Sequence, residues 1–531
     1  MHSRATTFKK VVFMQNVKRI AVASAFVTGI MFAAGAVQAL PASAIHGSQP
    51  GVLGAQGAKS DAPGVYFISP QGDDDNPGTK SAPFKTLMRA QEAATAGDTV
   101  YIRGGVYNQF EIPETDNPHE SLYHFVHDIY KSGITYQAFE GDERPVFDFS
   151  AVPTDQRVAA FYIGQEVTNV SFAGLDVTGV KVGDQKQSEA FRIAGGANFE
   201  NMAAYGNEAN GFYFTANGTG VVLNTDAYDN VGPTRASAGN TDGFGAHAKD
   251  VWFINTRAWG NSDDGFDSIS SSGRVAYVNS WAFNHQGNRD GVGDKNGFKV
   301  GGYSYRTEGL PDPLPVHTVI GSLAVGNGAN NFYANHQPGQ SAYWLNNTAD
   351  RPGHGSNFNL LERLSPSSPE NIAGFREVLH NNIAFNGPAT SNDATPAEKA
   401  TNNSWTINGG IDVSAEEFMS LDAGQLTAPR TNDGSLPEVT YLKPVAGSAL
   451  QAHGLGYLAD AEEPCSTLHT LVEAYTASGD IDNRGVSASL QSKLQERDLP
   501  AFAEELASQS GRHVSPYAAE TLALLARTLA W

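Results

Sequence analysis

The feature of this sequence that most constrains its fold is a seven-residue phrase that recurs along the chain. The phrase is Asn or Gly, two residues, Ala, a large apolar residue, one residue, and then usually Asn; its copies begin at Asn201, Asn224, Asn255, Asn279, Gly321 and Asn381. The apolar runs are too short, and too rich in β-branched and aromatic residues, for helices. One such unit cannot bury its own apolar face, so the units must stack on one another.

A second phrase follows most copies of the first, in the same order. It is a polar residue, Gly or Asn, and Phe, and it begins at Asn210, Asp242, Asp264, Asn296 and Asn330. Each unit is therefore a short strand, an Asn turn, and a second short strand. This pattern predicts an all-β chain folded as a parallel β-helix, with Asn side chains hydrogen-bonded in ladders at the corners. A β-sandwich with Asn-rich turns is the alternative, but two phrases recurring in a fixed order favour the stacked coils.

Stacking predicts which polar residues meet. Matching positions of successive coils lie about 4.8 Å apart. One matching set is Asp242, Asp264 and Asn296, and the other, three residues further on, is Gly245, Asp267 and Lys299. We therefore expect four carboxylates and one lysine on one face of the coil: Asp242, Asp263, Asp264, Asp267 and Lys299.

This cluster has the chemistry of a calcium site. Calcium takes six to eight oxygen ligands, and four unpaired carboxylates at one place repel one another unless a cation joins them. The carbonyl of Gly265 could add a further ligand. No matching cluster of His and Cys is present in the sequence, which disfavours zinc. A solvated acidic turn is the alternative for Asp263 and Asp264.

Lys299 is the candidate base beside this metal. A lysine has an ordinary pKa of about 10.4, so it needs desolvation, nearby positive charge or alkaline conditions to lose its proton. Calcium, Arg289 or Lys295 could supply the positive charge. A structural salt bridge from Lys299 to Asp267 is the competing interpretation.

A carboxylate-binding calcium beside a base suits removal of the proton α to a carboxylate. Uronic acid polymers carry such a proton at C5. Its removal leads to β-elimination, in which the glycosidic bond at O4 breaks. The formal net charge of −21 argues against electrostatic binding of nucleic acid or an anionic membrane by the mature protein. A bound metal would still allow an acidic polysaccharide to bind, and we expect the protein to act as a monomer.

The motifs Asp242-Gly-Phe, Ser262-Asp-Asp-Gly-Phe-Asp and Asn296-Gly-Phe-Lys-Val-Gly-Gly resemble those of the pectate lyases of polysaccharide lyase family 9. The resemblance covers about residues 65–450 and is strongest over 240–335. It implies a right-handed parallel β-helix and a secreted, Ca²⁺-dependent enzyme that cleaves de-esterified polygalacturonate to 4,5-unsaturated oligogalacturonides. By motif match, the resemblance implies that Lys299 is the Brønsted base. It also implies that the metal ligands are Asp242, Asp263, Asp264 and Asp267, with the Gly265 carbonyl as a candidate fifth ligand.

Gly265 departs from a larger residue often found at its position in that family. Three further residues are candidate substrate contacts: His247, Arg289 and Lys295.

The remaining segments set the domain organisation. Residues 1–44 resemble a secretory signal, with a basic start, an apolar stretch and small-residue cleavage sites, and 45–64 resemble a linker. We expect the β-helix over 65–455 and a small α-helical domain over 464–531, similar to the FIMAH module. Cys465 is the single cysteine, so the mature chain has no internal disulfide.

Three rival functions remain open at this stage. The first is a lyase for another uronate polymer, such as alginate, a glycosaminoglycan or rhamnogalacturonan. The second is a non-catalytic β-helix that binds carbohydrate and uses calcium for stability, although such a protein does not need a lone lysine facing the metal. The third is a β-helical glycoside hydrolase that uses two carboxylates without calcium.

Overall fold

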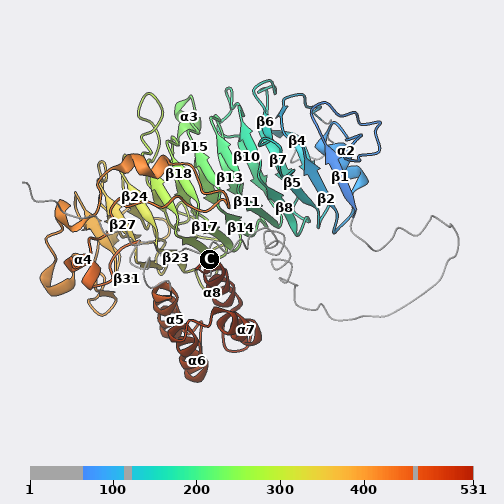
Figure 1. Cartoon of the computed structure of the whole chain (residues 1–531). Coiled ribbons are helices and arrows are strands. Elements are labelled where there is room, and N and C mark those ends of the chain that lie inside the picture. The colour runs from blue at the N-terminus through green and yellow to red at the C-terminus, as the bar shows by residue number, and fades with distance from the viewer. Residues whose placement is uncertain (1–63, 113–121, 458–464, 530–531) are drawn as a thin grey trace, which may run out of the picture. The chain divides into compact units, whose positions relative to one another are not determined.

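The computed structural model describes residues 64–112, 122–457 and 465–529. Its strands form three large parallel sheets, and the chain visits each sheet in turn as it winds along the stack (Figure 1). The first sheet has twelve strands: β1 (Val65–Ile68), β2 (Thr99–Ile102), β5 (Thr135–Ala138), β8 (Val170–Ala173), β11 (Ala197–Glu200), β14 (Gly220–Leu223), β17 (Val251–Ile254), β20 (Val275–Val278), β23 (His317–Ile320), β26 (Ala342–Leu345), β31 (Val378–His380) and β34 (Ala400–Thr401).

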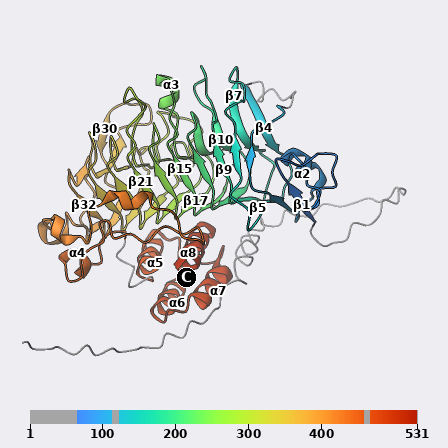
Figure 2. The same ribbon diagram turned by 45° about the horizontal axis from the view of Figure 1, so that its top comes forward.

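The second and third sheets have ten strands each. The second contains β4 (Tyr123–Ile129), β7 (Arg157–Ile163), β10 (Glu189–Ile193), β13 (Asn210–Phe214), β16 (Phe244–Ala246), β19 (Phe266–Asp267), β22 (Phe298–Lys299), β25 (Phe332–Tyr333), β28 (Phe358–Asn359) and β33 (Thr390–Ser391). The third contains β3 (Val106–Tyr107), β6 (Val146–Asp148), β9 (Asp176–Thr178), β12 (Ala203–Tyr205), β15 (Asp226–Tyr228), β18 (Arg257–Trp259), β21 (Trp281–Phe283), β24 (Leu323–Val325), β27 (Thr348–Asp350) and β32 (Ile383–Phe385). This is the predicted parallel β-helix, and in Figure 2 the colour passes along it from blue to yellow in chain order.

The recurring phrase is the turn from the first sheet through the third to the second. Its first residue adopts a left-handed backbone, with φ of 52° at Asn201, 51° at Asn224 and 61° at Gly321, a conformation that Asn and Gly tolerate best. Its last residue builds a buried ladder: the Asn207 amide donates to Asn230 at 2.9 Å, and the Asn230 amide donates to Asn261 at 3.0 Å. The two asparagines of each phrase thus serve two different corners.

The interior of the coil is filled by a stack of phenylalanines, most of which belong to the second phrase. Successive rings stack with centroids 4.6 to 5.4 Å apart, close to the strand spacing; the stack runs Phe191, Phe212, Phe244, Phe266, Phe298, Phe332 and Phe358. Because these side chains point inward and side chains alternate along a strand, the residue after each Phe points away from the core.

Short elements cover the start and side of the coil. The helix α2 (Leu87–Ala93) buries Leu87 and Ala90 in the main core, and its Gln91 amide donates to the Asp128 carbonyl of β4 at 2.8 Å. The helix α3 (Arg235–Ala238) lies just before the predicted metal site and is capped by Thr234. The strands β29 (Leu361–Arg363) and β30 (Asn371–Ala373) form a small antiparallel pair.

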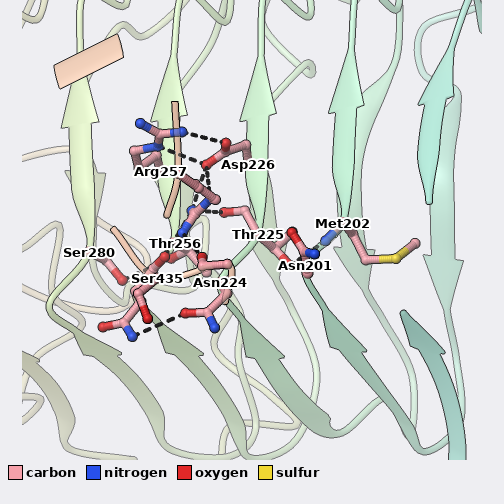
Figure 3. Close-up of polar contacts among 12 residues, drawn as sticks. Asn201, Met202, Asn224, Thr225, Asp226, Thr256, Arg257, Ser280 and Ser435 are labelled. Atoms are coloured by element: carbon pink, nitrogen blue, oxygen red, sulfur yellow. Dashed lines mark hydrogen bonds and ion pairs between the residues drawn. The ribbon is translucent and has the colours of Figure 1, made fainter. Parts of the chain in front are cut away.

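The chain after the last coil covers the third sheet. It contains the 3₁₀ turns η3 (Ile407–Gly409), η4 (Ala415–Glu417) and η5 (Ala423–Thr427) and the helix α4 (Ala449–Ala452). Leu426, Tyr441 and Leu450 share an apolar cluster with Trp281 and Phe283 of that sheet. This segment reaches back to the middle of the stack, where Arg430 pairs with Asp226 at 2.6 Å. Arg257 pairs with the same carboxylate at 2.7 Å (Figure 3). It therefore follows the side of the coil.

Four helices end the chain: α5 (Ser466–Ser478), α6 (Arg484–Gln495), α7 (Leu499–Gln509) and α8 (Pro516–Leu529). They share a buried apolar cluster with the outer side of the first sheet, to which Trp252 and Tyr343 contribute. The Trp252 indole donates to Thr521 at 2.9 Å, and Arg274 pairs with Asp480 at 2.6 Å. The predicted helical region is thus present and packed. None of the helices in the described part of the chain is long and apolar enough to cross a membrane; the predicted signal (1–44) and nearly all of the linker lie outside the described residues.

Candidate active site

The predicted site lies where strands of the second sheet begin, on a ladder of Asn and Asp side chains. In each rung a side-chain oxygen accepts the backbone N–H of the next coil: Asn210 from Asp242 at 2.8 Å, Asp242 from Asp264 at 3.0 Å, and Asp264 from Asn296 at 2.7 Å. Asn296 then accepts from Asn330 at 3.2 Å. The ladder fixes the Asp242 and Asp264 carboxylates one above the other.

The second predicted set is also in register. Gly245 pairs with Asp267, Asp267 with Lys299, and Lys299 with Tyr333. Each follows a buried Phe, so Asp267 and Lys299 lie on the outer face of the sheet, and both side chains are nonetheless nearly buried. The register expected from the repeat is therefore present.

Acidic groups surround the Lys299 ammonium. Its Nζ lies 3.3 Å from Asp264 Oδ2, 3.2 Å from Asp267 Oδ2 and 2.9 Å from Asp294 Oδ2. Burial acts to lower the lysine pKa, but the carboxylates of Asp267, Asp264, Asp294 and Asp263 outweigh it and hold the pKa well above its ordinary value. In this arrangement Lys299 is a protonated ion-pair partner.

Asp294 is a site residue that the sequence reasoning missed. It lies in the long insertion between β21 and β22, and its backbone N–H donates to Asp263 Oδ1 at 2.5 Å. The one sequence signal was its position five residues before Lys299.

The carboxylates of the site are closely crowded. Oxygens of Asp242, Asp263 and Asp264 lie within 4.8 Å of one another, and so do ligand atoms of Asp242, His247 and Asp267. Burial and mutual repulsion raise the pKa values of Asp242 and Asp264 well above the usual range, and burial raises that of Asp263 to about 7. Apart from its ion pair with Lys299, Asp264 Oδ2 has no hydrogen-bond partner among the described residues. The carboxylate oxygens of Asp242, Asp263, Asp264 and Asp267 are ligands of the kind that a calcium ion takes.

The structure explains the glycine at position 265. A Cβ there would lie 2.6 Å from the Gly297 carbonyl oxygen and 2.6 Å from His285 Nε2. His285 takes the place of an Asn in the buried ladder, where its Nδ1 accepts the Asn261 N–H at 3.2 Å. The Gly265 carbonyl accepts the Phe244 N–H at 3.0 Å, which leaves its second lone pair for the predicted role as a ligand.

The three candidate substrate contacts lie in different places. His247 is beside the carboxylates, 4.9 Å from the Tyr213 ring, and its buried Nε2 has no hydrogen-bond partner in the described part of the chain. The Arg289 side chain is 88% exposed and 3.9 Å from Asp290. The Lys295 Nζ donates to the Gly291 carbonyl at 3.0 Å, on a cavity next to the site.

Parallel coils that present an acid cluster and one lysine on an outer sheet face define a polysaccharide lyase of the β-helix type. Residues 66–382 match the family described as "Pel9A-like, right handed beta helix region", and the chain belongs to that family. It is 31% identical to pectate lyase L of Dickeya chrysanthemi over 73% of this chain and 85% of that protein. The chain is thus a pectate lyase-like enzyme.

Two solved structures are also similar. One, a rhamnogalacturonan lyase, is 33% identical with a TM-score of 0.66 over 74% of this chain and all of that one. The other, pectate lyase Pel9A, is 28% identical with a TM-score of 0.54 over 72% of this chain and 90% of that one. Both agree with the right-handed parallel β-helix.

Proposed function

We propose that the protein is a calcium-dependent pectate lyase that cleaves de-esterified polygalacturonate by β-elimination. The observation that carries the proposal is the position of Lys299, in register with Asp267 and in contact with Asp264 at the edge of the acid cluster. A carbohydrate-binding β-helix does not need a buried lysine there. The similarity to pectate lyase L supports the choice of polymer.

Residues of the chain would hold the metal ion and supply the base. Asp242, Asp263, Asp264 and Asp267 would hold Ca²⁺, which, when bound, neutralises the sugar carboxylate and acidifies the proton at C5. Lys299 in its neutral form takes that proton, a double bond forms between C4 and C5, and the bond from C4 to O4 breaks. The departing O4 takes up a proton from solvent. Asp294 stabilises the ammonium that Lys299 becomes.

The outer face of the second sheet offers a path for a long polymer. The row that contains Asp267 and Lys299 continues in register to Tyr213 and Arg192 on one side and to Tyr333 on the other. Its rungs are about 4.8 Å apart, so a chain lying along the coil axis meets a new side chain at each rung. Aromatic and cationic side chains there suit sugar rings and carboxylates.

We further propose that the mature protein is secreted and acts as a monomer. The support for export is the basic, apolar and small-residue pattern of residues 1–44. Comparing the mass of the protein recovered from culture medium with that of the full chain tests whether the protein is secreted, and a full-length intracellular product refutes secretion.

The deciding experiment follows the ultraviolet absorbance of the unsaturated product on polygalacturonate at alkaline pH. We expect absorbance to rise with Ca²⁺, to stop with a chelator, and to be absent in the Lys299→Ala variant. New reducing ends without absorbance would mean hydrolysis and would refute the mechanism.

A second candidate substrate is rhamnogalacturonan, because the rhamnogalacturonan lyase structure matches this chain with the higher TM-score of the two. The same absorbance assay on homogalacturonan and on a rhamnogalacturonan backbone at equal uronate concentration separates the two. A greater kcat/KM on the rhamnogalacturonan backbone would replace the polymer in our proposal and leave its chemistry unchanged.

A further inference from the structure

A cavity of 460 Å³ lies next to the site, on the turns that lead from the third sheet to the second. Three successive turns line it: the one between β21 and β22, the one between β24 and β25, and the one between β27 and β28. Its volume falls within the range of about 300–1,000 Å³ that is usual for small-molecule sites. A sugar ring therefore fits by size.

Glycines allow the turns around this cavity to stack closely. A Cβ on Gly353 would lie 2.1 Å from the Gly328 carbonyl oxygen, and a Cβ on Gly328 would lie 3.1 Å from Lys295 Cδ. The turns can stack this closely only without side chains at these positions. The resulting wall exposes backbone and leaves the long side chains of Lys295 and Arg351 to define the polar surface.

The charge of the cavity is opposite to that of the chain. Its lining contains Lys295, Arg351 and His354 and no carboxylate, although the chain has a formal net charge of −21. Lys295 donates to a neutral carbonyl, and among the described residues no carboxylate lies within ion-pair distance of it. Arg351 is paired with Asp350 at 3.1 Å, and its side chain is 51% exposed.

The wall of the cavity is also a wall of the catalytic site. Asp294 contacts Lys299 at 2.9 Å, and the next residue, Lys295, lines the cavity while its backbone N–H donates to the Asp263 carbonyl at 3.1 Å. The segment 294–295 thus places the Asp294 carboxylate against Lys299 and the Lys295 side chain at the cavity.

We propose that this cavity is a uronate subsite, in which Lys295 and Arg351 bind the carboxylate of a sugar residue outside the bond that is cleaved. Charge-assisted hydrogen bonds from Lys and Arg to a carboxylate are among the stronger polar contacts, and the stacked backbone turns can accept hydrogen bonds from sugar hydroxyls. The inference rests on the proposed function, because it takes the ligand to be part of an acidic polysaccharide.

Calorimetry on the full chain carrying Lys299→Ala tests the subsite without turnover. The probe is a saturated oligogalacturonate in the presence of Ca²⁺, with a neutral galactan oligomer of equal length for comparison. We expect Lys295→Gln, added to this background, to weaken oligogalacturonate binding about tenfold, the effect of losing one hydrogen bond between charged groups. Arg351→Gln should act in the same direction, and circular dichroism checks that both variants fold.

The matched control is Lys399→Gln, which removes one exposed positive charge away from the cavity. Equal affinity in the Lys295→Gln and control proteins would overturn the proposal, and so would equally tight binding of the neutral oligomer. If the otherwise unmodified chain fails to cleave polygalacturonate while Lys295→Gln still weakens binding, the proposed function fails and the subsite stands. Cleavage together with unchanged affinity refutes the subsite alone.

Discussion

Replacing Asp294 with Asn tests whether Lys299 is the base. The Asp294 carboxylate lies 2.9 Å from the Lys299 Nζ and stabilises the protonated form. Because the Asp294 side chain is 59% exposed, solvent screens the pair, and contacts of this kind contribute about 0.2–1 kcal/mol. Since one pKa unit corresponds to about 1.36 kcal/mol, the lysine pKa should fall by up to about 0.7 units.

The sign of the effect follows from the charge. Removing a carboxylate destabilises the ammonium, so the neutral base is present at lower pH, and the acidic limb of the kcat/KM profile should move to lower pH. The assay measures initial rates of product absorbance across alkaline pH at saturating Ca²⁺. Asp290→Asn is the matched control, because its carboxylate lies in the same insertion, is 68% exposed and is nearest to Arg289. A limb that stays in place, or moves to higher pH, would refute the reasoning.

Three further substitutions test separately the base, the metal site and the packing of the fold. Lys299→Ala should abolish elimination while calorimetry still detects Ca²⁺ binding and circular dichroism shows a folded chain, although loss of the buried ion pairs lowers the melting temperature; surviving activity would exclude Lys299 as the base. Asp264→Ala should lower Ca²⁺ affinity and activity together and also destabilise the protein, since Asp264 accepts hydrogen bonds from Asn296 at 2.7 and 2.9 Å; unchanged metal affinity would remove it from the site. Gly265→Val should lower the free energy of unfolding by about 1–3 kcal/mol through overpacking against His285, and a denaturation curve equal to the parent's would contradict this.

The sequence predicted those parts of the molecule that repeat. A phrase that returns at each coil carries both its turn residues and its register, so Asp267 and Lys299 could be paired from numbering alone. Asp294 could not be found in this way, because it lies in an insertion with no counterpart in the other coils. The packing of the final helices on the first sheet depends on contacts between distant segments such as Trp252 and Thr521, which no local pattern encodes.

The repeat also provides an internal comparison for the acidic residues. Asn210, Asn296 and Asn330 serve as rungs of the same ladder as Asp242 and Asp264, and their amide oxygens accept the same backbone hydrogen bond. Asp at two adjacent rungs therefore adds buried negative charge that the ladder does not require, and burial of unpaired charge is costly.

The neighbouring row shows the same concentration of charge. Its rungs on either side of Asp267 and Lys299 are Gly245 and Tyr333, both neutral. One lysine cannot neutralise all of Asp242, Asp263, Asp264, Asp267 and Asp294, and the crowding of these acids contributes to the raised pKa values of Asp242 and Asp264. In our proposal, a divalent cation bound by these carboxylates offsets part of their negative charge and so weakens their stabilisation of the Lys299 ammonium. We therefore propose that the arrangement in which Lys299 is an ion-pair partner without metal is also the one that lets it act as a base when calcium is bound.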